Sequence, residues 1–116
     1  MESILKTVRA ARVSGDDDTT FDDELIIHIN TTFMFLTRIG VGPPEGFHIK
    51  GDSEQWTEFI PEDNISYEGV KTYVLTKVEL LFDPPASSTL LQAKKDLLAE
   101  LEWSLNFRAE LDARKT

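Results

Sequence analysis

Phe82-Asp83-Pro84-Pro85-Ala86-Ser87-Ser88 separates two segments of helical periodicity, and the rest of the chain is arranged around this corner. Asp83 precedes a proline, which disfavours helical backbone, so the first helix is predicted to end there. Pro85 stands just before the second helix, where a fixed φ and a missing N–H cost little. Ser87 or Ser88 supplies a hydroxyl that can cap the second helix. The predicted structural corner consists of Phe82, Asp83, Pro84 and Pro85.

The segments on either side of the corner predict two helices, one from about Ser66 to Phe82 and one from about Ser88 to Asp112. The first has an apolar stripe of Tyr67, Val70, Tyr73, Val74, Val78 and Leu81. The second is expected to span about 37 Å, whereas a compact chain of this length is only about 35 Å across. The stretch 103–116 is therefore expected either to project from the domain or to be disordered.

The last predicted helix carries apolar side chains on two sides. One arc is expected to face the core and contains Leu90, Leu91, Leu97, Leu98, Leu101 and Leu105. The other side carries Trp103, Phe107 and Leu111 at intervals of four residues. Since one face can pack on the chain's own core, the second face needs another partner, and these three residues are a candidate interface with another part of this chain or with another chain.

Two earlier helices are predicted, over about 3–13 and 22–38. The first has the stripe Ile4, Leu5, Val8 and Ala11, with Arg9 off the stripe. The second has the core stripe Phe21, Leu25, Ile29, Phe33 and Leu36. Thr20 and Asp23 resemble a capping box at its start. Ile27 and Met34 fall on the opposite face and form a second candidate interface.

Residues 40–65 are rich in glycine and proline and form an irregular connection between the second and third long helices. Within it, 47–50 alternates and predicts a brief strand or an extended segment. Ser53 is placed to cap a short helical turn from Glu54 to Phe59. The aromatic residues Phe47, Trp56 and Phe59 predict that this connection packs as a cover over the core.

The 116 residues suffice for one domain, 1–116, of mainly α class: a small bundle of about four helices. The net charge of −9 argues against a nucleic-acid-binding surface. The acidity is greatest at 16–24, which has six carboxylates and no basic residue. The absence of cysteine excludes disulfides and thiolate sites. No signal peptide or membrane-spanning run is recognised, so no membrane association is expected.

The sequence lacks the residue patterns of catalysis and metal binding. Asp16-x-Asp18-x-Thr20 begins like a calcium loop, but Phe21 replaces the required glycine and Ile27 the required glutamate. His28 lies beside a core stripe and is interpreted as structural. No zinc-protease motif, phosphate loop or nucleophile elbow occurs. We therefore expect no enzyme activity, no cofactor and no metal.

The order of several motifs resembles a known family. These motifs are Asp-Thr-Thr-Phe-Asp-Asp-Glu-Leu at 18–25, Gly40-Val41-Gly42, Trp56-Thr57-Glu58-Phe59, Val70-Lys71-x-Tyr73-x-x-x-Lys77, Leu81-Phe82-Asp83-Pro84-Pro85 and Glu100-Leu101-Glu102-Trp103-x-Leu105-Asn106. Together they resemble the small head–tail connector (adaptor, or head-completion) proteins of long-tailed bacteriophages and prophages, over nearly the whole chain.

The resemblance implies a mostly helical, non-enzymatic virion protein of the neck, present in the host cytoplasm during assembly. It implies a homo-oligomeric ring, usually of about twelve copies and monomeric in solution in some cases. Such a ring joins the portal protein to stopper or tail-completion proteins, and DNA passes through its bore without specific binding. Two alternatives stay open: a tail-completion or head-closure (stopper) protein, suggested by the loop 40–65, and an acidic regulatory or inhibitor protein, suggested by the net charge.

Overall fold

The computed structural model describes residues 2–13 and 18–114. These residues form α1 (Ile4–Arg12), α2 (Asp22–Arg38), α3 (Trp56–Phe59), α4 (Tyr67–Phe82) and α5 (Ser88–Arg114). The predicted mainly helical fold is confirmed, with four long or medium helices and the short α3 in the predicted helical turn. Asp16 and Asp17, the first part of the acidic run, lie outside the described residues.

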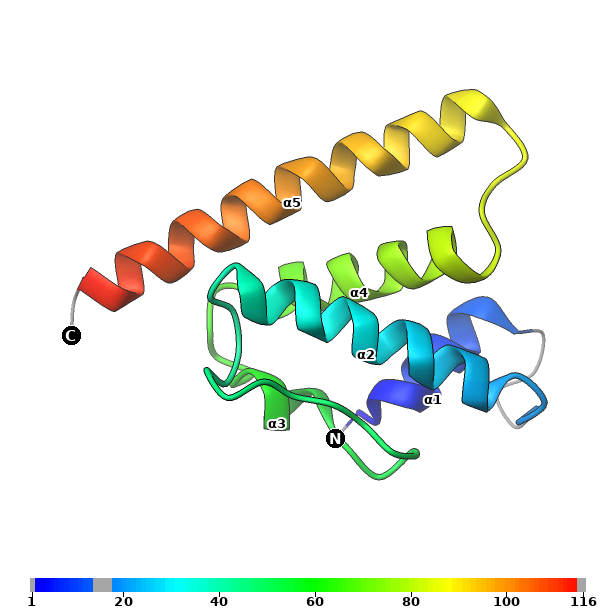
Figure 1. Cartoon of the computed structure of the whole chain (residues 1–116), viewed down its shortest axis with the longest axis horizontal. Coiled ribbons are helices and arrows are strands. Elements are labelled where there is room, and N and C mark those ends of the chain that lie inside the picture. The colour runs from blue at the N-terminus through cyan, green and yellow to red at the C-terminus, as the bar shows by residue number, and fades with distance from the viewer. Residues whose placement is uncertain (1, 14–17, 115–116) are drawn as a thin grey trace.

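Helix α4 is the centre of the packing, because it contacts α1, α2 and α5 (Figure 1). The stripes predicted for α2 and α4 supply nearly half of the buried apolar residues of the core. Their buried members are Leu25, Ile29, Phe33, Leu36, Tyr67, Val70, Tyr73, Val74 and Val78. Side chains at intervals of three and four lie on one face of a helix, so each stripe is removed from water as a unit.

Phe21 was predicted to belong to the core stripe, and this prediction is wrong. Its side chain is exposed, since α2 begins one residue later and Phe21, as the N-cap residue, does not have helical backbone. Instead its ring packs edge-on against Phe82, with centroids 5.5 Å apart. The contact ties the start of α2 to the end of α4.

Arg9 is buried, although the sequence placed it off the apolar stripe of α1. Its Nε donates to Asp22 Oδ1 at 3.0 Å, and its Nη2 donates to Asp22 Oδ2 at 2.7 Å. A two-pronged ion pair of this kind satisfies a guanidinium away from water. Ala11, placed on the stripe, is exposed. The ion pair with Asp22 of α2, rather than the local periodicity of apolar residues, therefore decides which face of α1 is buried.

The predicted helix caps are only partly correct. The Thr20–Asp23 capping box does not form, because Phe21 occupies the N-cap of α2 and makes no side-chain cap bond. The short helix α3 begins after Gln55 rather than after Ser53, and the Gln55 amide donates to Glu58 Oε2 at 2.8 Å. The carboxylates in the first turn of α2 remain favourable next to the positive end of the helix dipole.

Residues 40–65 pack against the core as predicted, but no strand forms among the described residues of this connection. The extended alternative is correct for Ile49, which is buried. The Asn30 side chain donates to Ile49 O at 3.0 Å and accepts from Ile49 N at 2.8 Å. Asn30 therefore satisfies the backbone of a buried, unpaired segment, as a neighbouring strand would.

Helix α5 has 27 residues and is about 40 Å long. The molecule measures 43 × 35 × 21 Å, so this helix runs along nearly its whole length (Figure 1). The stretch 103–114 is helical, and Asn106 Nδ2 donates to Ile39 O at 3.0 Å. The C-terminal part is thus tied to the end of α2; residues 115 and 116 lie outside the described part of the chain.

The arc of α5 predicted to face the core is buried only in part. Leu98 and Leu105 are 4% exposed, whereas Leu90 is 47% and Leu97 is 40% exposed. Leu81 on α4, also predicted as core, is exposed. Figure 1 shows α4 and α5 well separated near their connecting linker, so the leucines at that end have no opposing layer.

Candidate functional site

The outer face of α5 carries a pair of exposed aromatic side chains. Trp103 is 68% and Phe107 is 49% exposed, and their rings stack with centroids 5.3 Å apart and an interplanar angle of 7°. Leucines on the opposite side of α5 are buried at 98 and 105, which fixes the outward direction of this pair. Aromatic side chains dominate the energetics of protein interfaces, so this pair is the strongest candidate contact point.

Further apolar atoms extend the aromatic pair into a shallow hollow. Ile65, in the turn before α4, is exposed and lines this hollow with Trp103, Phe107 and the half-buried Leu111. Three of the five residues predicted as an interface are therefore brought together here. Ile65 was missed by the sequence analysis, because only the tertiary packing places it beside α5.

The other two predicted interface residues lie on a separate surface. Ile27 and Met34 are 63% and 61% exposed on the outer face of α2, opposite its buried stripe. Since α4 packs against both α2 and α5, the two outer faces belong to different sides of the molecule. The protein thus presents two unlike apolar patches, one on α2 and one on α5; their role as interfaces stays a prediction.

The predicted structural corner adopts the expected conformation. Helix α4 ends at Phe82, and the Asp83 amide still donates to Glu79 O at 2.8 Å. Ser87 Oγ accepts from the Leu90 amide at 3.2 Å, which caps the start of α5. Pro84 and Pro85 lie between these two ends and prevent a continuous helix. The corner therefore sets the direction of α5 relative to α4.

The three aromatic residues predicted as a cover gather around Phe33 of α2. The Phe33 ring centroid lies 5.2 Å from Phe47, 6.4 Å from Trp56 and 4.5 Å from Phe59. The indole Nε1 of Trp56 donates to Thr7 Oγ1 at 3.1 Å. Trp56 and Phe59 are buried, so these residues hold the connection against the core and are not available to a partner.

Gly42 is a required part of this cover. Its φ is +86°, and a Cβ at this position would lie 2.4 Å from the Phe59 ring. Only glycine combines that backbone conformation with so close a contact. Residue 42 therefore fixes the path of the loop across Phe59.

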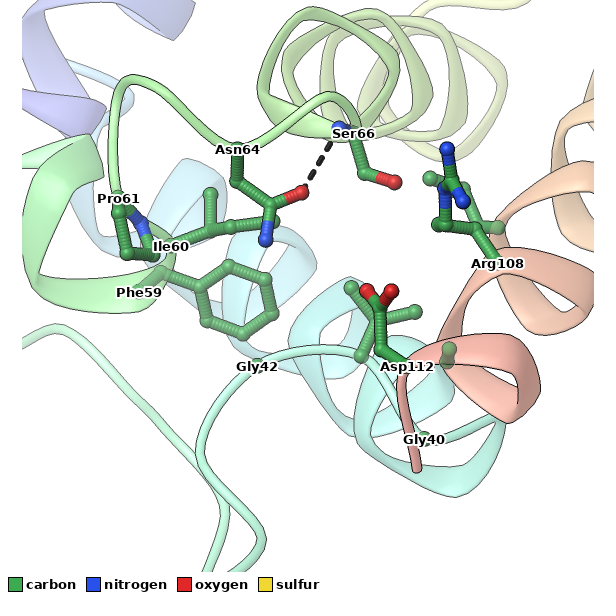
Figure 2. Close-up of a pocket in the computed structure, with 12 residues that line it drawn as sticks. Gly40, Gly42, Phe59, Ile60, Pro61, Asn64, Ser66, Arg108 and Asp112 are labelled. Atoms are coloured by element: carbon green, nitrogen blue, oxygen red, sulfur yellow. Dashed lines mark hydrogen bonds between the residues drawn. The ribbon is translucent and has the colours of Figure 1, made fainter. Parts of the chain in front are cut away.

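A small hollow lies beside this loop, where it meets the second half of α5 (Figure 2). Its volume is about 220 Å³, and it is lined by Gly42, Phe59, Asn64, Arg108 and Asp112, among others. This is smaller than the roughly 300 Å³ of the smallest usual ligand pockets. Among the described residues, no group of three His, Asp or Glu side chains is arranged to hold a metal ion.

A family model described as phage connector protein matches residues 4–112. The chain belongs to the phage connector protein family. No curated protein and no solved structure matches it. The match covers every helix except the last two residues of α5.

Family membership makes this connector protein a structural component of the phage particle, one that assembles with other head or tail proteins. Within the described residues, no helix is both long and apolar enough to cross a membrane. The connector protein's candidate functional features are therefore its surfaces, and the outer faces of α2 and α5 carry its most exposed apolar side chains at helical spacing: Ile27, Met34 and Trp103.

Proposed function

We propose that this protein is an adaptor subunit of a head–tail connector ring in the neck of the phage particle. In this function it joins the portal of the DNA-filled capsid to the stopper or tail-completion proteins. The observation that carries the proposal is the stacked, exposed Trp103–Phe107 pair on a helix of a phage connector protein. Leaving two aromatic rings in water is unfavourable, and burial against a partner removes that cost.

The charge of the protein suits a channel through which DNA moves. With a net charge of −9, the subunit repels the phosphate backbone and does not hold it in place. A ring of about twelve such subunits would carry this charge around its bore. The proposed ring therefore conducts DNA without binding it specifically.

The head-closure alternative receives less support from the loop 40–65. A stopper needs a loop that can move into the bore, whereas this connection is held by Asn30, by Gly42 against Phe59, and by the buried Trp56. The regulatory alternative requires a continuous acidic surface that mimics nucleic acid. The C-terminal segment 86–116 is instead balanced, with five acidic and five basic residues.

The test is the mass of the purified protein, alone and mixed with the portal ring of the same phage, by native mass spectrometry or sedimentation. We expect co-migration with the portal, with about twelve copies of this protein per portal ring. Trp103→Ala and Phe107→Asp should weaken this binding while leaving the thermal midpoint nearly unchanged, since both side chains are exposed.

Leu90→Ala is the matched control, because Leu90 is an exposed apolar residue of the same helix away from the aromatic pair. It should leave binding intact. A monomer that ignores the portal, or aromatic variants that bind normally, would contradict the proposal. Binding to the tail tube but not to the portal would transfer support to the head-closure alternative.

A further inference from the structure

The outer faces of α2 and α5 carry acidic, apolar and basic side chains in the same order along the helix. The α2 outer face consists of Asp23, Ile27, Met34 and Arg38, at intervals of four, seven and four residues. The α5 outer face consists of Glu100, Trp103, Phe107 and Arg114, at intervals of three, four and seven. All eight side chains are exposed, and each set lies on one side of its helix. Each face thus has an acidic end, an apolar middle and a basic end.

The two faces also match in length. Asp23 and Arg38 are about 22 Å apart along α2, and Glu100 and Arg114 are about 21 Å apart along α5. If the helices pack antiparallel, Arg38 lies opposite Glu100 and Asp23 lies opposite Arg114. A parallel arrangement would place like charges at both ends, so the charge order selects the antiparallel one.

We propose that the α5 outer face of one copy packs antiparallel on the α2 outer face of the next copy. In this register Met34 meets Trp103, a favourable thioether–aromatic contact, and Ile27 lies opposite Leu111, one turn beyond Phe107. The contact rests on the proposed ring function and names the partner of the aromatic pair: a second copy of this chain. The portal then binds elsewhere on the assembled ring or gathers the copies into it.

A second copy's α2 fits this face better than a second copy's α5 does. An antiparallel α5 pair centred on Trp103 and Phe107 would place Glu100 opposite Glu110, two like charges at the edge of an apolar contact. Glu110 also lies one turn before Arg114 and weakens the positive charge at that end of the face. Of the two proposed ion pairs, Arg38–Glu100 is therefore the clearer charge match. The two faces are unlike and lie on either side of α4. When two copies bind in this way, one copy keeps a free α2 face and the other a free α5 face, so further copies can add until the ring closes.

The absence of cysteine allows a direct test by cross-linking. Met34→Cys and Trp103→Cys are prepared as separate proteins with different tags, mixed, and oxidised mildly, both alone and with the portal ring. Disulfides form only when the Cα atoms come within about 7 Å. We expect the mixed dimer to form at about tenfold higher yield than either self-dimer. Thr72→Cys, on an exposed position of α4 outside both faces, replaces Met34→Cys in the control mixture.

A charge exchange within the same pair of proteins tests the register. In the cross-linking pair, Arg38→Glu in the Met34→Cys protein, or Glu100→Arg in the Trp103→Cys protein, should lower the yield about fivefold, and the two together should restore it. Predominant Trp103→Cys self-dimers, or no mixed dimer with the portal present, would overturn the inference. If the unmodified protein still co-migrates with the portal in that case, the connector function stands and only this interface fails. If the mixed dimer forms but the protein does not bind the portal, the interface between copies stands and the proposed connector function fails.

Discussion

The two halves of α5 have similar leucine content but different surroundings. In the first half, from Ser88 to Leu97, Leu90 and Leu97 are exposed, and Lys94 forms an ion pair with Glu79 of α4. In the second half, Leu98 and Leu105 are buried, and Leu105 approaches Gly69 so closely that a Cβ there would lie 3.4 Å from its Cδ2. Helix formation is therefore uniform along α5, whereas its attachment to the body is concentrated in one half.

The difference shows that periodicity determines which side chains share a face, but the neighbouring helices determine whether that face is buried. Near the linker, α5 diverges from α4, so the first half lacks an opposing layer (Figure 1). Farther along, Tyr73 of α4 and the carbonyl of Ile39 both bond to side chains of α5. The second half is thus part of the folded core, and the first half is a largely exposed arm.

The largest expected effect comes from shortening a leucine in the second half. Leu105→Ala should lower the free energy of unfolding by about 2–5 kcal/mol, because it leaves a cavity between α4 and α5. Leu90→Ala makes the same chemical change in the first half, and it should cost no more than about 0.5–1 kcal/mol. Urea unfolding of both variants measures the difference. Equal losses would show that both halves are equally packed.

A smaller effect is expected at the hydrogen bond from Tyr73 Oη to Glu102 Oε2, which is 2.9 Å long. Burial and then the Glu102 hydrogen bond raise the pKa of Tyr73 well above its usual value of 10.0. The folded state therefore keeps this proton at a pH where the unfolded chain loses it, and stability should fall as the pH rises above about 10. Tyr73→Phe should cost about 1–2 kcal/mol at neutral pH and make that alkaline decline shallower.

Unfolding free energies of both proteins between pH 8 and pH 11 provide the measurement. A residual decline is expected in the variant, since burial raises the pKa of Tyr67 and the hydrogen bond to Glu2 raises that of Lys71. An alkaline decline of unchanged steepness in Tyr73→Phe would argue that Tyr73 does not link the second half of α5 to α4.

The smallest effect is expected at the ion pair that holds the first half. Lys94 and Glu79 are both partly exposed, so Lys94→Met should change the free energy of unfolding by less than about 1 kcal/mol. The difference from the parent protein should decrease in high salt, which screens the pair. A loss as large as that of Leu105→Ala, or one independent of salt, would show that the first half is essential to the fold.

Much of the fold was predictable from local sequence patterns. Proline and glycine placement located the corner at 82–85 and the irregular connection at 40–65, and the spacing of apolar residues gave α2 its correct bounds. The errors at the helix caps are local, whereas the errors in burial involve interactions between distant residues. Arg9 is buried because Asp22 reaches it from another helix, and Leu81 and Leu90 are exposed because no second layer reaches the linker end. Leu97, seven residues after Leu90, lies on the same exposed edge of α5, next to the buried Leu98.

The candidate surfaces were predictable to a similar extent. The outward direction of Trp103, Phe107, Ile27 and Met34 followed from their position opposite a buried stripe, and their exposure is confirmed. Their division into two separate faces did not follow, since it depends on α4 lying between α2 and α5. Ile65 joins the aromatic pair only through the turn before α4, and no sequence period reports that contact.

The fit of Gly42 against Phe59 determines where the connection between α2 and α4 can vary in sequence. A larger residue at position 42 would force a Cβ into an aromatic ring, whereas a Cβ at Gly46 or Gly51 would meet no atom within 4 Å. Gly51 also lacks the positive φ of Gly42 and Gly46, so it accepts other residues without backbone strain. Because the chain has no cysteine, Gly51→Cys is consequently a position in this connection at which a fluorescent label can be attached while the core and both outer faces stay intact.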